Sequence, residues 1–540
     1  MAKKVYYNGY VYTVNANRDV ASAVVIEDDR IVYVGDDEGA KAFAGPDAEA
    51  KDLEGKMMLP GFIDGHCHPI MAAHFMSGIV LDIDWSTEEN LKAIRKYVEE
   101  HPEKEAYIGN GYAEFNFDEH GPSKKLLDEI CSDKPMMILG SGGHEGWVNS
   151  KALELAGITK DTPDPVPGLH YYARDEEGNP SGHVAESQAM DVFFDTIEFF
   201  DKESLAGLLE QISNDYASNG VTTTADMGVT EMIGAESYKS CLDTIKAGPY
   251  KQRFNGPGLL LADEAAVDKN LQVAKDLRDA FNDDWVRISL YKVINDGTME
   301  SRTAANSEPY PEDGSVVEPL LDEEAMAKVV LKAAKEGFDI NVHAIGDKAI
   351  KSVIAAAKAV REAGLKDTRI TCSHCQYIHP DDVEAFATYD ITANSTGVWF
   401  YGNPLMDKVL GHINDETFRM KSLKDAGARV AFGSDFPVDE YGNEPLKSIE
   451  MAVTRKMYGQ PDAPMLKPYD EVLTVDDAIA AYTIHNAIQL HMEDRLGTIE
   501  PGKYADLVVL EQNLFEIPPE EIHKVKVAET IIAGKTVYEG

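Results

Sequence analysis

The stretch Leu59-Pro-Gly-Phe-Ile-Asp-Gly-His-Cys-His-Pro69 is an apolar run that ends in two histidines separated by one residue. Side chains alternate along a β-strand, so the pattern predicts a buried strand that places His66 and His68 on one face. Two imidazoles on the same face can bind one metal ion. Cys67, which lies between them, is expected to point the other way and to pack.

Seven more short apolar runs follow, and the segments between them carry the 3.6-residue apolar spacing of helices. Buried strands that alternate with helices are typical of a parallel sheet, and eight strands close a (β/α)8 TIM barrel. We therefore predict an α/β fold built on such a barrel. The predicted strands cover residues 61–65, 221–226, around 252–261, 286–292, 339–343, 368–374, 391–395 and 430–435.

The two ends of the chain have a different pattern from the middle. Residues 1–58 and 496–540 contain short alternating runs broken by turn residues, and we expect them to form one composite β-sandwich around a barrel of residues 59–495. The first and second barrel strands are about 150 residues apart, far more than one crossover needs. Approximately residues 80–200 are therefore predicted to form an inserted subdomain.

The composition limits the classes of partner. The 540 residues include 94 acidic and 51 basic side chains, a net charge of −43, which disfavours nucleic acid and anionic membranes. With 44% hydrophobic residues the chain can build a sizeable core. The five cysteines do not suggest a disulfide framework, and we see neither a signal peptide nor a long apolar run. We expect a soluble cytoplasmic protein.

Three more potential metal ligands follow later predicted strands. His343 and His374 end apolar runs, and Asp435 comes directly after another. Each alone could be a hydrogen-bonded core histidine or a capping aspartate. Because the active sites of barrels form at the carboxyl ends of the strands, these residues together with His66 and His68 predict a metal site at the barrel mouth. Imidazole and carboxylate suit several divalent metals, and we expect zinc first, as one or two ions.

Lys292 ends another predicted strand on its interior face. A buried ammonium is costly unless it is neutralised or paired. N-carboxylation by CO₂ would convert it into an anionic ligand able to bridge two metals. The alternatives are a lysine that extends to the barrel mouth or pairs with Asp296.

Cys372-Ser-His-Cys375 has the C-x-x-C spacing of redox and zinc motifs. Residues three apart on a strand face opposite sides, and there is no second such pair in the chain. We therefore disfavour both a redox and a zinc-knuckle reading.

Several motifs in order resemble the amidohydrolase superfamily over nearly the full length, and within it the amidohydrolase-3 or YtcJ-like branch, which includes N-substituted formamide deformylases. The matching segments are Leu59-Pro-Gly-Phe-Ile-Asp-Gly-His-Cys-His, Gly143-His-Glu-Gly-Trp-Val-Asn-Ser-Lys-Ala-Leu, Gly220-Val-Thr-Thr-Thr, Lys292 with Asp296-Gly297, His343-Ala-Ile-Gly-Asp, His374-Cys-Gln, Gly433-Ser-Asp-Phe-Pro-Val and Leu496-Gly-Thr-Ile-Glu-Pro-Gly-Lys-Tyr-Ala-Asp-Leu. The resemblance implies a distorted barrel with a composite β-sandwich. It also implies the following metal ligands: His66, His68, His343, His374 and Asp435, with Lys292 in the place of the carboxylated lysine of binuclear relatives.

The resemblance says less about substrate contacts. His144 and Trp147 match a branch motif in the insertion, and together with Asp296 they are our candidates for substrate binding; His144 could equally have a structural role. The segment 393–399 lacks the Gln-Pro associated with this branch. That departure affects what can be expected of the substrate pocket rather than of the metal site.

The expected function is metal-dependent hydrolysis of a non-peptide C–N bond in a small molecule, such as an N-acyl or N-formyl amide. A metal-activated hydroxide would attack the carbonyl, and Asp435 would move the proton to the leaving nitrogen. Alternatives are an esterase, lactonase or deaminase on the same site, and a non-catalytic assembly protein. Homo-oligomerisation is expected from the family resemblance alone.

Overall fold

The centre of the molecule is a sheet of eight parallel strands whose order in space follows their order in the chain. The computed structural model describes residues 3–113, 116–117, 121–199, 204–228, 230–260, 266–438 and 443–540. The eight strands are β8 (Phe62–Cys67), β15 (Val221–Asp226), β16 (Arg253–Leu260), β17 (Val286–Ile294), β18 (Asp339–Ala344), β19 (Ile370–His374), β20 (Ile391–Thr396) and β21 (Arg429–Gly433). The predicted barrel-type α/β fold is confirmed.

All eight predicted barrel strands are present, and their ends differ by a few residues. The strand predicted around 252–261 ends in a residue outside the described ones. The largest consequence concerns β21, which ends at Gly433, so Asp435 lies in the following loop. Its backbone has a φ of 56°, in the left-handed region that a strand does not use.

Hydrogen bonds between β8 and the loop after β21 join the two ends of the sheet at its carboxyl side. The Asp435 N–H donates to the His66 carbonyl over 2.7 Å, and the His68 N–H donates to the Phe436 carbonyl over 2.7 Å. The Ser434 N–H and hydroxyl both donate to the Asp64 carboxylate. The loop after β21 is thereby fixed against the histidines that follow β8.

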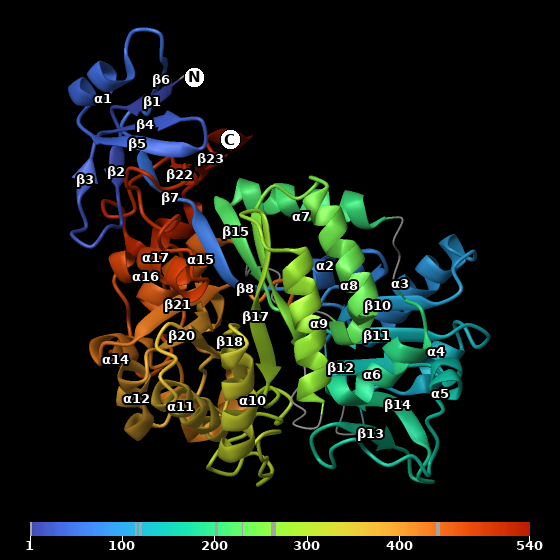
Figure 1. Ribbon diagram of the computed structural model, residues 1–540. Helices are drawn as coiled ribbons and strands as arrows, with labels where there is room; N and C mark the ends of the chain where they lie inside the picture. The colour runs from blue at the N-terminus through green and yellow to red at the C-terminus, as the bar shows by residue number, and fades with distance from the viewer. Residues whose placement is uncertain are drawn as a thin grey trace.

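Helices lie around the sheet (Figure 1). They are α7 (Leu205–Ser218), α8 (Thr230–Lys246), α9 (Val267–Ala280), α10 (Glu323–Lys335), α11 (Asp347–Glu362), α12 (Val383–Thr388), α13 (Pro404–Leu410), α14 (Met420–Asp425), α15 (Pro445–Thr454), α16 (Val475–Ala481) and α17 (Ile484–Gln489). Helix α10 illustrates why they form. The side chain of Asp322 caps its first turn by accepting from the Ala325 N–H, and apolar residues at helical spacing, Met326, Val329 and Val330 among them, are buried.

The two ends of the chain share a six-stranded sheet, in the order β24-β23-β22-β7-β2-β3, and lie near each other in Figure 1. A second sheet, β5-β4-β1-β6, comes from the N-terminal segment alone. The elements are β1 (Lys3–Tyr7), β2 (Tyr10–Tyr12), β3 (Val20–Ala21), β4 (Ala23–Glu27), β5 (Arg30–Gly35), α1 (Asp37–Ala44), β6 (Glu49–Asp52), β7 (Met57–Pro60), β22 (Leu507–Leu510), β23 (Val527–Ile532) and β24 (Lys535–Glu539). One buried cluster, with Tyr6, Ile26, Leu507 and Ile531, joins both ends.

Between β8 and β15 the chain builds an insertion with its own six-stranded sheet, β13-β14-β12-β11-β10-β9, which lies beside the barrel (Figure 1). Its elements are β9 (Ile79–Val80), α3 (Thr87–Glu100), β10 (Tyr107–Tyr112), α4 (Lys124–Asp128), β11 (Met136–Gly140), β12 (Glu145–Val148), α5 (Ser150–Ala156), β13 (Tyr171–Arg174), β14 (Pro180–Ala185) and α6 (Ser187–Thr196). Helix α2 (Pro69–Met76) leads into it from the barrel. The exact domain limits stay a prediction.

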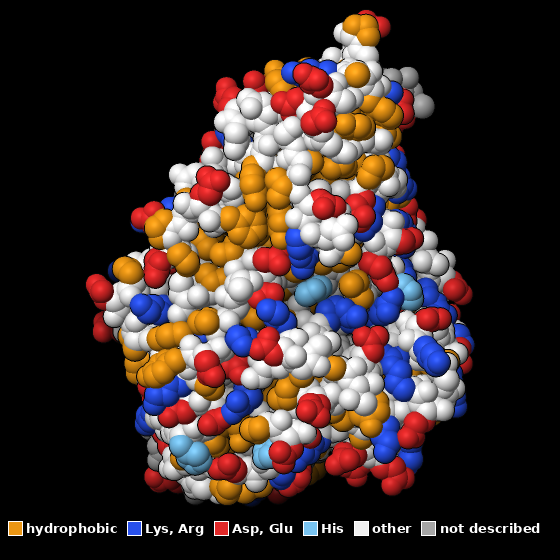
Figure 2. All heavy atoms as spheres, turned by 90° about the vertical axis from the view of Figure 1, so that its left-hand side faces the viewer, with side chains coloured by type: hydrophobic (Ala, Val, Ile, Leu, Met, Phe, Trp, Pro, Cys, Tyr) orange, Lys and Arg blue, Asp and Glu red, His pale blue; other side chains and the backbone are white. Residues whose placement is uncertain are grey.

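The surface carries the acidic excess of the sequence. Acidic side chains are spread from top to bottom of the face drawn in Figure 2, with basic side chains between them. In the described part of the chain, no helix is both long and apolar enough to cross a membrane.

Candidate metal centre

Three side chains from different strand ends form the centre of the site. His66 of β8, His374 of β19 and Asp435 after β21 each offer one ligand atom, and these atoms lie within 4.8 Å of one another. His66 Nε2 is 3.3 Å from Asp435 Oδ1, and His374 Nδ1 is 3.9 Å from Asp435 Oδ2. All three residues are buried. Donor atoms at these separations can bind a common cation.

The other two predicted histidines lie against this group. His68 Nε2 is 3.4 Å from Asp435 Oδ1, and the ring centroids of His343 and His374 are 4.5 Å apart. Residues spread over some 370 positions of sequence are therefore brought to one cavity. Their roles as metal ligands stay a proposal.

Neighbouring polar groups orient two of the imidazoles. His68 Nδ1 is 3.0 Å from the Gly228 carbonyl, and His66 Nδ1 is 3.0 Å from Ser373 Oγ. Each ring is thereby held with its Nε2 beside Asp435. Such bonds to the far nitrogen are the usual way in which proteins fix a metal-binding histidine.

The electrostatic surroundings keep the His66, His343 and His374 rings neutral. Burial lowers the pKa of His66 well below its ordinary value, and the nearby Lys292 ammonium lowers it further. Burial likewise lowers the pKa of His343 and His374, with the neighbouring imidazoles adding to the effect. Neutral imidazole is the form that coordinates a metal, so the donor set fits a divalent ion.

Lys292 lies in the same cavity and is only 2% exposed, so its side chain does not extend to solvent. Its Nζ is 3.0 Å from Asn341 Oδ1, which also accepts from Ser373 Oγ over 2.9 Å. A polar chain therefore links the lysine through Asn341 and Ser373 to His66. This arrangement is compatible with either a cationic or a carboxylated lysine.

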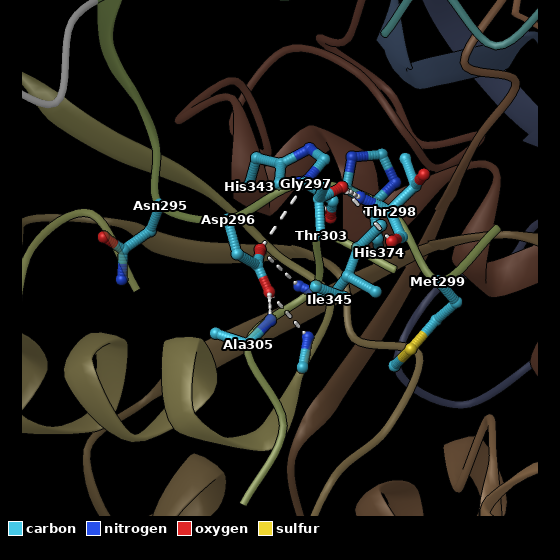
Figure 3. Close-up of polar contacts among 12 residues, drawn as sticks. Asn295, Asp296, Gly297, Thr298, Met299, Thr303, Ala305, His343, Ile345 and His374 are labelled. Atoms are coloured by element: carbon cyan, nitrogen blue, oxygen red, sulfur yellow. Dashed lines mark hydrogen bonds and ion pairs between the residues drawn. The ribbon is translucent and has the colours of Figure 1, made fainter. Parts of the chain in front are cut away.

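Asp296 is placed differently from our expectation. Its carboxylate accepts three backbone N–H bonds, from Ala305 over 3.0 Å, Ile345 over 3.0 Å and Gly346 over 2.9 Å (Figure 3). Burial raises its pKa to about 7, against the opposing effect of these donors. The carboxylate thereby joins the loops after β17 and β18. One of its oxygens also lies 3.7 Å from His343 Nε2. Asp296 is not among the residues that line the cavity, so the expectation that it contacts substrate has no support in the structure.

The site opens into a cavity of about 120 Å³. The barrel supplies the histidines, Asp435 and Lys292, whereas the insertion supplies a facing wall that includes His144, Glu186 and Met190. His144 therefore lines the cavity. The insertion completes the site that the barrel begins.

Trp147 corrects a second expectation. It is fully buried in a separate cluster of the insertion, among Tyr107, Leu127 and Ile138, and its indole N–H donates to the Ser123 carbonyl over 2.9 Å. In β12 the side chains alternate, so Trp147 faces away from the side on which His144 lies. Trp147 packs in the core of the insertion and does not contact the cavity.

Glu186 is a site residue that sequence reasoning missed. It precedes α6 with a left-handed φ of 67°, and its carboxylate bonds to His144 Nδ1 over 2.7 Å and to Thr303 Oγ1 over 2.6 Å. Burial lowers the pKa of His144, but the Glu186 carboxylate outweighs burial and raises it to about 9. The backbone conformation that aims Glu186 into the cavity has no signature in the sequence.

The polypeptide is strained where the site is built. His374, Cys375 and Asp435 all have positive φ, at 73°, 46° and 56°. Non-glycine residues adopt such angles at a cost that functional sites commonly carry.

Cys372 and Cys375 are buried and form no disulfide, and burial raises the pKa of the Cys375 thiol well above its ordinary value. This fits our sequence argument against a redox pair.

Comparison with known proteins agrees with this geometry. The model of the Amidohydrolase family matches residues 49–538. The chain belongs to the amidohydrolase family. Membership makes it a hydrolase of the class that acts on carbon–nitrogen bonds, and the resemblance noted from the motifs is confirmed.

Three relatives show how the likeness is distributed. The chain is 36% identical to the exoenzymes regulatory protein AepA of Pectobacterium carotovorum subsp. carotovorum, over 72% of this chain and 83% of that protein. It is 29% identical to the putative amidohydrolase YtcJ of Bacillus subtilis, over 99% of both. It is 28% identical to the N-substituted formamide deformylase of Arthrobacter pascens, over 98% of this chain and 97% of that protein.

The fold is shared with solved structures. An uncharacterized metal-dependent hydrolase from Pyrococcus horikoshii OT3 superposes with a TM-score of 0.74 at 22% identity, over 96% of this chain and 99% of that chain. At this identity the likeness establishes the fold.

Proposed function

We propose that this protein is a metal-dependent hydrolase that cleaves the C–N bond of a small N-acyl or N-formyl amide. The observation that carries the proposal is the convergence of ligand atoms from His66, His374 and Asp435 within 4.8 Å at one end of the barrel. Family membership supports the hydrolase class, and the full-length likeness to a formamide deformylase favours an amide bond over other bonds.

In this proposal four histidines and Asp435 hold one or two divalent ions, with zinc the first candidate. A bound ion would polarise the substrate carbonyl and lower the pKa of a coordinated water to about 7. Lys292 would take part as a carboxylated ligand, because a buried ammonium among four imidazoles is unfavourable and a carbamate would be attracted to the cations. The polar chain through Asn341 and Ser373 supports its position.

Asp435 would move the proton. Its Oδ1 lies 3.3 Å from His66 Nε2 and 3.4 Å from His68 Nε2, so the carboxylate faces the point where the ligand atoms meet. From there it can accept a proton from the attacking water and deliver it to the departing nitrogen. Amide nitrogen leaves poorly without a proton, so this step matters most for C–N substrates.

His144 would hold the substrate carbonyl from the opposite wall. Its Nδ1 is bonded to Glu186, which leaves the other ring nitrogen as the donor toward the cavity. A pKa of about 9 keeps the ring protonated at neutral pH. A charged donor placed at the carbonyl oxygen stabilises the negative charge that develops there during attack.

The shape of the cavity favours a short acyl group. Its volume of about 120 Å³ holds only a few heavy atoms beside the reacting water, and Met71, Met190 and Phe194 give it an apolar side. A formyl or acetyl group fits this description better than a long acyl chain.

The test is a hydrolysis assay of protein reloaded with Zn²⁺, Mn²⁺ or Co²⁺ against matched N-formyl amides, N-acetyl amides, esters and lactones. We expect amide cleavage that a chelator abolishes and metal restores, and that Asp435→Asn lacks. Efficient hydrolysis of esters or lactones with no amide cleaved would replace the amide assignment with the esterase alternative. Release of ammonia without a carboxylic acid product would indicate a deaminase.

A further inference from the structure

Helix α6 contributes side chains to two cavities. Met190 and Phe194, four residues apart, lie on one face and line the cavity of the metal centre. Asp191 lies about 100° around the helix from Met190. Gln188 and Asp191 line a second cavity. Asp191 therefore borders both cavities.

The second cavity is the larger, at about 730 Å³. Its walls are two loops far apart in the sequence: residues 165–169 of the insertion and residues 316–320 before α10. Sites for small organic ligands usually have volumes of about 300–1,000 Å³, which this cavity matches and the inner one does not. We call it the outer cavity.

The walls of the outer cavity are held in place. Leu169 from one loop and Val317 from the other pack in the same buried cluster. Val166 and His170 exchange two backbone hydrogen bonds, of 3.1 and 2.8 Å, and the Leu320 N–H donates to the Asn295 carbonyl over 2.8 Å. The outer cavity is therefore a formed site with both loops anchored.

Asp191 is the acid in this wall that has capacity for a ligand. In the described part of the chain it has no hydrogen bond or ion pair, although burial raises its pKa to about 7, with Asp195 adding to the effect. Glu318, the other carboxylate of the wall, is already paired with Lys348 over 2.6 Å. Asp191 is partly buried and borders both cavities, so its carboxylate can pair with a cationic ligand there.

We propose that the outer cavity binds the amine-side substituent of the substrate and that this substituent carries a positive charge, which pairs with Asp191. The inference rests on the proposed function, since it places the acyl group at the metal centre and the rest of the molecule outside. The net charge of −43 favours the same class, because a strongly negative protein attracts cations and repels anions. The substrate class is thus an N-acyl or N-formyl amide with an ammonium-type group.

The experiment compares two isosteric substrates that differ in charge. N-formyl amines that end in trimethylammonium or in the neutral tert-butyl group, with linkers of graded length, are assayed with metal-loaded protein. We expect wild type to prefer the cationic member by about 10- to 100-fold in kcat/KM, mainly through KM, as for a partly buried ion pair. Asp191→Asn should remove this preference. Asp195→Asn, one turn further along α6, is the matched control and should keep it.

The outcomes separate this inference from the proposed function. No preference in wild type at any linker length, or a preference that Asp191→Asn retains, contradicts it. An equal fall for both substrates in Asp191→Asn would show a structural role and also contradicts it. If neither substrate is hydrolysed, the proposed function fails, and calorimetric titration of the two compounds still decides the inference: tighter binding of the cation, lost in Asp191→Asn, supports it, and equal binding overturns it.

Discussion

Two buried polar clusters lie at opposite ends of the barrel, and they differ in how their charges are satisfied. At the amino end, Arg253 at the start of β16 meets Asp506 of the C-terminal segment through two bonds, of 2.7 and 3.2 Å. Asp506 also accepts from the Ala533 N–H, and Arg253 donates to the Asp284 carbonyl. The charges of Arg253 and Asp506 are thus satisfied by groups of the protein itself.

At the carboxyl end the balance is different. The barrel contributes four imidazoles, Lys292 and one carboxylate, Asp435, to the cavity, and burial keeps the His66, His343 and His374 rings neutral. Neutral nitrogen donors and a carboxylate that face one another can together bind a metal cation. The contrast assigns the amino end to stability and the carboxyl end to function, as is usual in barrel enzymes.

The largest effect is expected at Asp435. Asp435→Asn removes both a ligand and the proposed proton carrier, and kcat/KM for an amide substrate should fall about 10³-fold or more. The melting temperature of the metal-free protein should change little, because the loop is also held by backbone bonds to β8. A variant that retains most of its activity would remove Asp435 from the mechanism.

The next effect should appear at the amino end, in stability and not in chemistry. Arg253→Met leaves Asp506 buried without its partner and should lower the free energy of unfolding by about 3–5 kcal/mol. Metal content and kcat of the folded fraction should stay near wild type. Denaturant titration with elemental analysis checks both, and the double variant Arg253→Met/Asp506→Leu should recover part of the loss. Loss of metal from folded Arg253→Met would contradict the assignment of the amino end to stability alone.

A smaller effect is expected from a neighbour of the ligands. Ser373→Ala removes the hydroxyl that orients His66 and should weaken metal affinity by about 10- to 100-fold. Competition with a chelator measures this change. Ser395→Ala is the matched control, since that hydroxyl donates to the backbone carbonyl of His374 and leaves the ring untouched. Equal affinities in wild type and Ser373→Ala would contradict the orienting role.

The smallest effect should come from the insertion wall. Glu186→Gln should lower kcat/KM by about tenfold, in line with the loss of a bond to a charged group, without loss of metal. It also removes the group that raises the pKa of His144, so this pKa should fall. If activity needs protonated His144, the pH–rate profile of wild type falls as the pH rises through about 9. In the variant this fall should occur at lower pH. An unshifted pH–rate profile would separate His144 from catalysis.

Much of the barrel could be predicted because its signal is local. Each barrel strand is a short apolar run between polar turns, and the histidines lie at strand ends where periodicity fixes their direction. Asp435 was found from its place after such a run, although it lies beyond β21 and is oriented by its positive φ and by bonds to β8. The convergence of these side chains could therefore be predicted from the count of strands and the rule that their carboxyl ends meet, whereas their role as metal ligands stays a prediction.

The insertion was predictable only as a location. Glu186 reaches the cavity through an unusual backbone angle, and Asp191 borders the outer cavity only because two distant loops enclose it. Trp147 was misplaced because a shared motif does not say which face of β12 a residue occupies, and Asp296 because its backbone partners come from loops after two strands. Such contacts depend on tertiary packing, which one sequence does not display.

The central claim is tested most directly by a crystal structure of the metal-loaded protein with anomalous data collected at the metal edge. We expect one or two anomalous peaks within bonding distance of His66, His374 and Asp435, with extra density on Lys292 Nζ if the lysine is carboxylated. A correctly folded protein that binds no metal at this site, or binds it only elsewhere, would contradict the account.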